Sequence, residues 1–513
     1  MSGRPQRALA CLPRTAVWIA LLTCSAAAPI AWAGSEGDRL LAAGRAQEAA
    51  DAYARVLESS SDPAAVEGRV RALLALERWP QALEEARAHA SRAPGRPRVV
   101  SALAEALFRA GRLAEAEQAL EGLGPEVRTH ARALWTLSRL RGASGAVEEA
   151  LELVEHALTH DPDAAELHWW AAEVALSRAA SVAHLERFIA LVGSEDTDRA
   201  EAARGSIALF RRLEERPIWV SASRPERMEV PLRPVWNDQG RRLGYVISVR
   251  LGERDRPVRL LLDTGSPGLF LTRRIARKHG FEPLSETTTF GGGGDRRHRS
   301  TRGILSRFEL GSLAFVDALA TTTAAELEPQ GRFHGVVGLS LFNGYRVTFD
   351  LPRKRLLLEP GSNEVSGARY WTCAAQMLVR VTAEAGGSGL FLFDTGASWS
   401  VVSASFVESV PGARLGAPAD VRTYGGLVPG ARFVHGLQLE FEGLRAGGEV
   451  RAVDLSLRSR LTGAEVSGYL GLDLLDGGVL VVDTVARRVR IARPGAGQRR
   501  STPSARSASR GAP

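Results

Sequence analysis

Two segments of this 513-residue chain share one chemical pattern, in which an apolar strand runs directly into Asp-Thr-Gly. Two carboxylates held about 3 Å apart cannot both ionise, so they share one proton, and one serves as a base while the other serves as an acid. Such a pair can activate a water against an amide and protonate the departing amine without a metal. Two aspartates brought together in one site would therefore be able to perform this acid–base chemistry. The two motifs contain Asp263, Thr264, Gly265 and Ser266, and Asp394, Thr395, Gly396 and Ala397.

The two motifs belong to a longer internal duplication. The segment Gly335-Val-Val-Gly338 recurs as Gly468-Tyr-Leu-Gly471, and the separation between these two segments is nearly the same as that between the two aspartates. Apolar segments that end in Asp350 and Asp483 align at the same spacing, and because no glycine follows these aspartates we interpret them as structural turn residues. β-Branched and aromatic runs broken by glycine predict that both copies are all-β.

Both copies resemble the aspartic peptidase fold, and they are most similar to bacterial retropepsin-like domains. In that family each lobe supplies one Asp-Thr-Gly loop, and an apolar-apolar-Gly strand packs across it. Retropepsins assemble two identical chains around one site, whereas pepsins carry both lobes in one chain. The tandem copies here imply that one chain holds a complete site, with Asp263 and Asp394 as the catalytic pair. A monomer would then suffice, and its substrate would be a peptide or protein.

The resemblance also implies roles for the residues around the aspartates. Thr264 and Thr395 would each hydrogen-bond the backbone of the opposing loop and lock the loops together. The glycines Gly265 and Gly396 would supply backbone freedom for a tight turn and room for the carboxylates to meet. Neither aspartate is assigned as the acid or the base, because the apparent pKa values belong to the pair.

The fourth position of the motif differs between the two copies. Ser266 is expected to donate to the carboxylate of Asp263, whereas its counterpart Ala397 cannot donate from its side chain. The two aspartates are therefore expected to have unequal surroundings.

Glycine-rich stretches follow both aspartates at similar distances. The family needs a flap, a hairpin whose tip closes over the substrate and excludes water. A flexible loop without this function is the alternative, and no Gly-Lys-Ser/Thr follows that would bind phosphate. The predicted tips contain Gly291, Gly292, Gly293 and Gly294 in the first copy, and Tyr424, Gly425 and Gly426 in the second.

The first half of the chain has the composition and spacing of amphipathic helices. An alanine recurs there at almost constant intervals, and Pro94 and Pro162 each follow one of these alanines at the same distance. The pattern resembles the tetratricopeptide repeat, and a fifth, degenerate unit with Trp169 and Trp170 as a cap is expected. The repeats either stack only as a scaffold or also bind a peptide or partner protein. The recurring alanines are Ala49, Ala82, Ala116 and Ala150.

The net charge of +8 lies mostly at the two ends of the chain. Residues 1–33 contain three arginines and no acid, and residues 494–513 contain four arginines and no acid, which leaves +1 on residues 34–493. A nearly neutral body argues against nucleic acid as a partner.

The N-terminal segment, residues 1–33, resembles an export signal. It combines arginines, an apolar run from Ala16 and the pattern Ala31-Trp-Ala33, so a periplasmic or secreted protein is expected. The apolar run is too short for a membrane span. Lipid anchoring at Cys24 is the alternative, but Thr23 replaces the small residue that precedes the cysteine in lipoprotein signals. Cleavage would leave Cys373 alone, so no internal disulfide is expected.

These patterns together predict a multidomain protein, an N-terminal all-α tetratricopeptide solenoid followed by an all-β, bilobal, retropepsin-like domain. The leading hypothesis is an exported aspartic endopeptidase without metal or cofactor, because the ten histidines show no paired spacing. The alternative is a non-catalytic peptide- or protein-binding module in which the repeats are the functional part. The predicted segments are a signal peptide at 1–33, repeats at 34–215, a linker at 216–232, lobe 1 at 233–360, lobe 2 at 361–493 and a disordered basic tail at 494–513.

Overall fold

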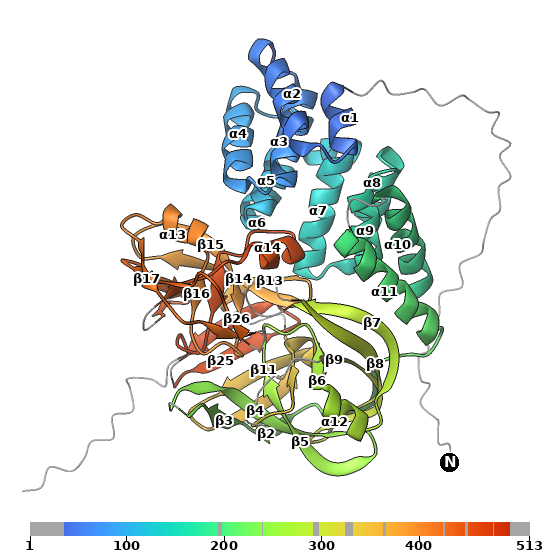
Figure 1. Ribbon diagram of the computed structural model, residues 1–513, viewed down its shortest axis with the longest axis vertical. Helices are drawn as coiled ribbons and strands as arrows, with labels where there is room; N and C mark the ends of the chain where they lie inside the picture. The colour runs from blue at the N-terminus through green and yellow to red at the C-terminus, as the bar shows by residue number, and fades with distance from the viewer. Residues whose placement is uncertain are drawn as a thin grey trace, which may run out of the picture.

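The computed structural model describes residues 35–192, 197–238, 240–290, 297–323, 332–362, 366–423, 426–446, 450–475 and 477–492. Within these residues, helices form the N-terminal part and two β-rich lobes form the rest (Figure 1). The predicted fold class is therefore confirmed as a helical repeat region followed by a β-rich domain. The predicted signal peptide at 1–33 and tail at 494–513 lie outside the described residues.

The helices of the N-terminal part pack in pairs, and the recurring alanines explain how closely they approach. Each of the four alanines is the fourth residue of the second helix of a pair and has 0% exposed surface. A methyl group at this position lets the neighbouring helix come near without leaving a cavity. The helices are α1 (Glu36–Ala42), α2 (Ala46–Ser59), α3 (Pro63–Ala75), α4 (Trp79–Arg92), α5 (Pro97–Arg109), α6 (Leu113–Glu121), α7 (Ala131–Ser144), α8 (Val147–His160), α9 (Ala165–Val174), α10 (Arg178–Val192) and α11 (Thr197–Leu213), with a 3₁₀ turn at Gly124–Thr129.

The two tryptophans assigned to a cap by the sequence pack against different helices. The indole N–H of Trp170 donates to the hydroxyl of Ser138 in α7 at 2.7 Å. The ring of Trp169 packs edge-on against Phe188 of α10, with 5.0 Å between the ring centroids. The helix α11 then follows, so the array extends beyond the predicted fifth unit. Among the described residues, no helix combines the length and apolar character that a membrane span requires.

The β-rich part consists of two lobes with matching strand order. Lobe 1 contains β3 (Arg233–Trp236), β4 (Arg242–Leu251), β5 (Arg254–Leu262), β6 (Leu269–Thr272), α12 (Arg273–Lys278), β7 (Glu282–Phe290), β8 (Arg297–Leu310), β9 (Leu313–Thr323), β10 (Gly335–Val337), a 3₁₀ turn at Leu339–Phe342, β11 (Tyr345–Asp350) and β12 (Arg355–Pro360). Lobe 2 contains β13 (Ala368–Cys373), β14 (Gln376–Ala383), β15 (Ser388–Phe393), β16 (Val401–Val402), α13 (Ala404–Ser409), β17 (Arg414–Pro418), β18 (Arg422–Thr423), β19 (Gly426–Leu427), β20 (Arg432–His435), β21 (Leu439–Phe441), β22 (Leu444–Arg445), β23 (Arg451–Ala452), α14 (Ser456–Thr462), β24 (Gly468–Leu470), β25 (Val479–Asp483) and β26 (Arg488–Ala492).

Residues 216–232, which the sequence predicts as a linker, are instead folded into the β-rich part. The strand β1 (Val220–Ser223) pairs antiparallel with β9, and β2 (Met228–Pro231) pairs antiparallel with β12. In β2, Met228 and Val230 are buried while the residues that follow each of them are exposed. Two strands of four residues give too short an alternation to stand out in a sequence, which is why the prediction was wrong here.

Both lobes contribute strands to one central antiparallel sheet, in the order β13-β26-β25-β11-β12-β2. The strands β11 and β25 pair at its centre, where Thr348 lies opposite Val481. These two residues have the same separation in sequence as Gly335 and Gly468, so they occupy equivalent positions of the duplication. At this one pair equivalent residues of the two lobes face each other, as a pseudo-twofold axis between β11 and β25 requires.

The buried aspartates at the ends of these central strands hold turns. Asp483 accepts from the backbone N–H groups of Val485 and Ala486 at 3.0 and 2.9 Å. Asp350 accepts from the backbone N–H of Arg353 at 3.2 Å and from the guanidinium of Arg355 at 2.9 Å. Both aspartates thus have the structural role that the missing glycine indicates.

The helical repeats contact both lobes through buried apolar surfaces. The core of the repeats around α5 to α8 is continuous with lobe 2, where it includes Leu390 and Val466. At the other end of the array, Leu209 of α11 packs in one cluster with Leu284 and Ile304 of lobe 1. The repeat array therefore bridges the two lobes, as its position above both of them in Figure 1 also indicates.

We expect Gly111→Ala to destabilise the protein more than Gly95→Ala. Both glycines have left-handed backbones, at φ 71° and 76°, which costs an alanine roughly 1–2 kcal/mol. A Cβ on Gly111 would also lie 2.8 Å from the carbonyl oxygen of Glu465 in lobe 2, whereas nothing lies within 4 Å of one on Gly95. This clash should add about 1–3 kcal/mol, measurable by urea unfolding. Equal losses for the two variants would contradict the tight contact between the repeats and lobe 2.

Candidate active site

Each aspartate of the two motifs follows the buried C-terminal end of a strand, Asp263 after β5 and Asp394 after β15. A short parallel strand lies beside each one, with β10 next to β5 and β24 next to β15. The backbone N–H of Asp263 donates to the carbonyl oxygen of Val337 at 3.0 Å, and that of Asp394 donates to Leu470 at 2.9 Å. The two apolar-apolar-Gly segments thus hold the two loops in equivalent ways.

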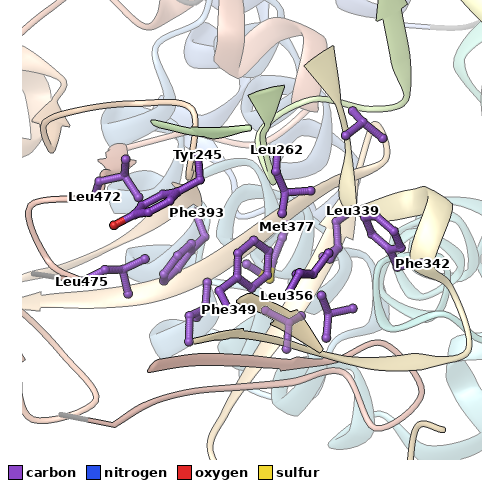
Figure 2. Close-up of a cluster of buried hydrophobic side chains, with 14 of the residues drawn as sticks. Tyr245, Leu262, Leu339, Phe342, Phe349, Leu356, Met377, Phe393, Leu472 and Leu475 are labelled. Carbon is purple, nitrogen blue, oxygen red and sulfur yellow. The ribbon is translucent and has the colours of Figure 1, made fainter. Parts of the chain in front are cut away.

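The residues immediately before the aspartates are buried in a core that both lobes share. Leu262 and Phe393 belong to one apolar cluster, together with Phe349 and Leu475 from opposite lobes (Figure 2). Because both strands end in this common core, the aspartates that follow them emerge at the boundary between the lobes.

The two threonines of the motifs cross-link the loops through reciprocal hydrogen bonds. The hydroxyl of Thr264 donates to the carbonyl oxygen of Phe393 at 2.6 Å and accepts from the backbone N–H of Thr395 at 3.1 Å. The hydroxyl of Thr395 donates to the carbonyl oxygen of Leu262 at 2.9 Å and accepts from the N–H of Thr264 at 3.1 Å. Both threonines are buried, so these bonds form without competition from water.

The two glycines of the motifs leave space in which the carboxyl groups meet. A Cβ on Gly265 would lie 2.8 Å from Cγ of Asp394, and one on Gly396 would lie 2.6 Å from Cγ of Asp263. The glycine N–H groups also donate within their own loops, at 2.7 Å to Oδ1 of Asp263 and 2.8 Å to Oδ1 of Asp394. Any side chain at either glycine would therefore collide with the opposing carboxyl group.

The two carboxyl groups act as one electrostatic unit. Burial raises the pKa of Asp263 well above its ordinary value, and the charge of Asp394 and the hydrogen bond between the two carboxyl groups raise it further. Burial also raises the pKa of Asp394, whereas the hydrogen bond with Asp263 and the N–H of Gly396 lower it. The pair therefore keeps a proton at a pH where separate carboxyl groups would have lost theirs. Both residues remain only half-buried, so solvent reaches them.

The expected role of the Ser266 side chain is wrong. Its hydroxyl donates to the carbonyl oxygen of Gly268 at 3.4 Å rather than to the carboxylate of Asp263. The backbone N–H of Ser266 instead helps to lower the pKa of Asp263. Because the opposite loop supplies an equivalent N–H from Ala397, 3.1 Å from Oδ1 of Asp394, the serine does not by itself make the two aspartates unequal.

The predicted flap tips fall largely outside the described residues. The glycines at 291–294 follow β7 and precede β8, which pair up to Phe290 and Arg297, but the tip itself is not described. Tyr424 and Gly425 are likewise outside, while Gly426 begins β19 and pairs with Thr423 of β18. Among the residues that the structure describes, no three His, Cys, Asp or Glu side chains come together as potential metal ligands.

Comparison with protein-family models agrees with this geometry. Residues 247–341 match the family model described as aspartyl protease, and residues 73–140 match a tetratricopeptide repeat model. The chain carries an aspartyl protease domain preceded by tetratricopeptide repeats. The first match contains Asp263 but ends before lobe 2, which is linked to the same family here by the internal duplication and the shared loop geometry.

Solved structures of other repeat proteins are similar to part of the chain. The tetratricopeptide protein TTC0263 of Thermus thermophilus is 22% identical, with 33% of this chain and 95% of that chain covered and a TM-score of 0.28. A MamA structure from Desulfovibrio magneticus RS-1 is 18% identical, with coverages of 31% and 92% and a TM-score of 0.22. A repeat protein from Parabacteroides merdae ATCC 43184 is 19% identical, with coverages of 34% and 69% and a TM-score of 0.26. No curated protein matches the chain.

Three residues that the sequence analysis did not single out as site residues lie beside the loops of the aspartyl protease domain. The side-chain amide of Gln376 donates to the carbonyl oxygen of Gly265. The guanidinium of Arg458 donates to the side chains of Gln376 and Tyr469, both at 3.1 Å. Tyr469 belongs to the repeated apolar-apolar-Gly motif, so its place beside the aspartate loop could have been predicted from the sequence. Arg458 is one of 66 basic residues, and nothing in its local sequence marks it.

Asp263→Asn is expected to raise the unfolding temperature at about pH 7 and to lose this advantage toward about pH 3. The pKa of Asp263 is raised in the folded protein, so the folded state holds this proton more tightly than the unfolded state does. A raised folded pKa contributes stability below the unfolded value, and this stability is lost as pH rises through the folded pKa. Asparagine keeps the shape of the side chain without this loss. Thermal unfolding across this pH range checks the prediction.

The exposed carboxylate of Asp255, in the same lobe, provides the control. Asp255→Asn should follow the wild-type dependence of unfolding temperature on pH. If Asp263→Asn differs from the wild type by a constant amount at every pH, the carboxyl groups do not share a proton as described.

Proposed function

We propose that the protein is an aspartic endopeptidase in which Asp263 and Asp394 share one proton and activate a water against a peptide bond. The observation that carries this proposal is the reciprocal threonine bonding, since it holds the two loops together where the carboxyl group of each lies against the glycine of the other. The half-exposed state of both residues supports access for water and an extended peptide.

The proposed reaction needs only the two carboxyl groups and a water. The ionised carboxylate takes a proton from the water as its oxygen attacks the peptide carbonyl carbon, and the protonated carboxyl group donates to the carbonyl oxygen. The resulting tetrahedral intermediate collapses when the amide nitrogen receives the proton taken from the water and the C–N bond breaks. The hydroxyl proton of the intermediate returns to the dyad. The products are a carboxylic acid and an amine, and the pair again holds one proton.

For the repeats we propose that the helices present a protein substrate or partner to the protease domain. Tetratricopeptide repeats are protein-binding modules, and the array is joined to both lobes by buried contacts. A bound protein would thus be held at a fixed position relative to the aspartates. Because the site is built from a single chain, we also propose that a monomer is active.

Incubation of the full chain with a mixed peptide library, from acid to neutral pH, should yield internal cleavage products detectable by mass spectrometry. Asp263→Asn and Asp394→Asn should each reduce the rate by about 10²–10⁴-fold or more, because each removes the acid or the base. Asp255→Asn is the matched control and should retain wild-type rates. If the wild type and both dyad variants behave alike, the proposed activity is wrong and the alternative of a binding module gains support.

Export is a further part of the proposal, and it rests on the sequence of residues 1–33 alone. Expression in a bacterium with an intact secretion pathway should place the protein outside the cytoplasm, with an N-terminus at Gly34. Mass spectrometry of the N-terminus and cell fractionation measure this. An uncleaved cytoplasmic product, or a lipid-modified Cys24, would contradict cleavage after Ala33.

A further inference from the structure

The helix α14 contacts the tetratricopeptide repeats at one end and lies near the catalytic pair through its middle. Arg458 projects from its third position, and Gly463 caps its C-terminal end in a left-handed conformation at φ 73°. The helix and the turn after it form one unit, because the backbone N–H of Val466 donates to the hydroxyl of Ser459 at 2.9 Å. A displacement of the turn would therefore also displace α14.

At the repeat end, a buried and a half-buried arginine hold the end of α14. Arg109 and Arg139, from α5 and α7, both donate to the carbonyl oxygen of Gly463, at 3.3 and 2.7 Å. The backbone N–H of Glu465 donates in return to the carbonyl oxygen of Arg109 at 2.6 Å. Charged donors at the C-terminal end of a helix satisfy its open carbonyl group and complement its dipole. This surface of the repeats is therefore occupied by lobe 2 itself.

Near the middle of α14, Arg458 belongs to a chain of polar contacts that leads to the aspartate loops. Its guanidinium donates to Gln376, whose amide donates to the carbonyl oxygen of Gly265, the glycine that faces Asp394. It also donates to the hydroxyl of Tyr469 in β24, which pairs with β15, the strand that Asp394 follows. The positive charge of Arg458 lowers the pKa of Asp394, which opposes part of the rise that burial causes.

Many of the contacts around the two carboxyl groups recur in both lobes, whereas the charge of Arg458 does not. The threonine bonds, the glycine N–H bonds and the strands beside the loops all recur in both lobes with similar distances. An ungapped alignment that superimposes Gly468 on Gly335 places Arg458 opposite Ala325, which lies outside the described residues. A symmetric pair would divide its proton evenly, and the arginine removes this symmetry.

We propose that Arg458 is a positioning residue that directs the negative charge of the pair to Asp394 and the shared proton to Asp263, and that the repeats hold α14 so that Arg458 keeps this place. Asp394 is then the base that takes the proton from water, and Asp263 is the acid that donates to the peptide carbonyl oxygen. The inference rests on the proposed function, because it assigns the two roles within the same site.

The test is a titration of the pair by ¹³C NMR in the full chain labelled at aspartate carboxyl groups. The two resonances are assigned by their loss in Asp263→Asn and Asp394→Asn. Arg458→Met should raise the lower apparent pKa of the pair by about one unit, since the anion loses its positive neighbour. The acid limb of the pH profile of kcat/KM should move to higher pH by the same amount. Arg458→Lys retains the charge and should restore most of this shift.

Two variants break the contact between the repeats and α14 from opposite sides. Arg139→Met removes a donor to Gly463, and Gly463→Ala places a Cβ 2.4 Å from the Nη2 atom of Arg139. Both should raise the same apparent pKa and increase deuterium uptake over residues 456–466. Glu77→Gln is the control, because it disrupts only an exposed ion pair, 3.2 Å long, with Arg460 of α14. It should change neither the apparent pKa nor the deuterium uptake. If Arg139→Met does not fold, Gly463→Ala alone tests whether the repeats hold Arg458 in place.

An unshifted titration in Arg458→Met would overturn the assignment of the two carboxyl groups. A shift in Arg458→Met without one in Gly463→Ala would overturn the role of the repeats. Because the NMR titration requires no turnover, a chain that titrates as predicted but hydrolyses no peptide would contradict the proposed function alone.

Discussion

Two threonine hydroxyl groups, each donating to a backbone carbonyl of the opposite lobe, set the geometry on which the site depends. Because each hydroxyl also accepts from the opposing threonine N–H, four backbone groups are paired where the loops cross. The aspartates that precede the threonines are therefore held in fixed loops. The glycines that follow the threonines have no side chain that would keep the two carboxyl groups apart. Sharing of one proton follows from this backbone arrangement rather than from any unusual property of the aspartates themselves.

The hydrogen bonds between the two loops form only if the lobes keep their relative position. Three parts of the molecule fix that position. The central sheet pairs β11 with β25 across the pseudo-twofold axis. The core below the loops contains side chains of both lobes, as Figure 2 shows. The repeats add a third connection, since they pack on lobe 2 through α5 to α8 and on lobe 1 through α11. The tetratricopeptide repeats are therefore a structural part of the protease domain.

The fold class and the central residues of the site could be predicted because their signals are local and repeated. A short motif present twice at a constant offset identified Asp263 and Asp394, and buried alanines at a fixed spacing identified the repeats. The direction of the Ser266 hydroxyl depends on one side-chain torsion, which sequence does not encode locally. Arg458 and Gln376 reach the loops through contacts distant in sequence. The surface between repeats and lobes was also not predictable, because an apolar face that covers another domain has the same pattern as an ordinary core.

The central claim is that each single chain contains one complete, proton-sharing site. Mixing Asp263→Asn with Asp394→Asn, each expected to be at least about 10²-fold slower than the wild type, tests it most directly when peptide hydrolysis is followed over a range of chain concentrations beside the wild type. We predict wild-type rates proportional to concentration, and a mixture that is no faster at any concentration than the two variants measured separately. Hydrolysis restored in the mixture would contradict the claim, because it would require a site assembled from two chains.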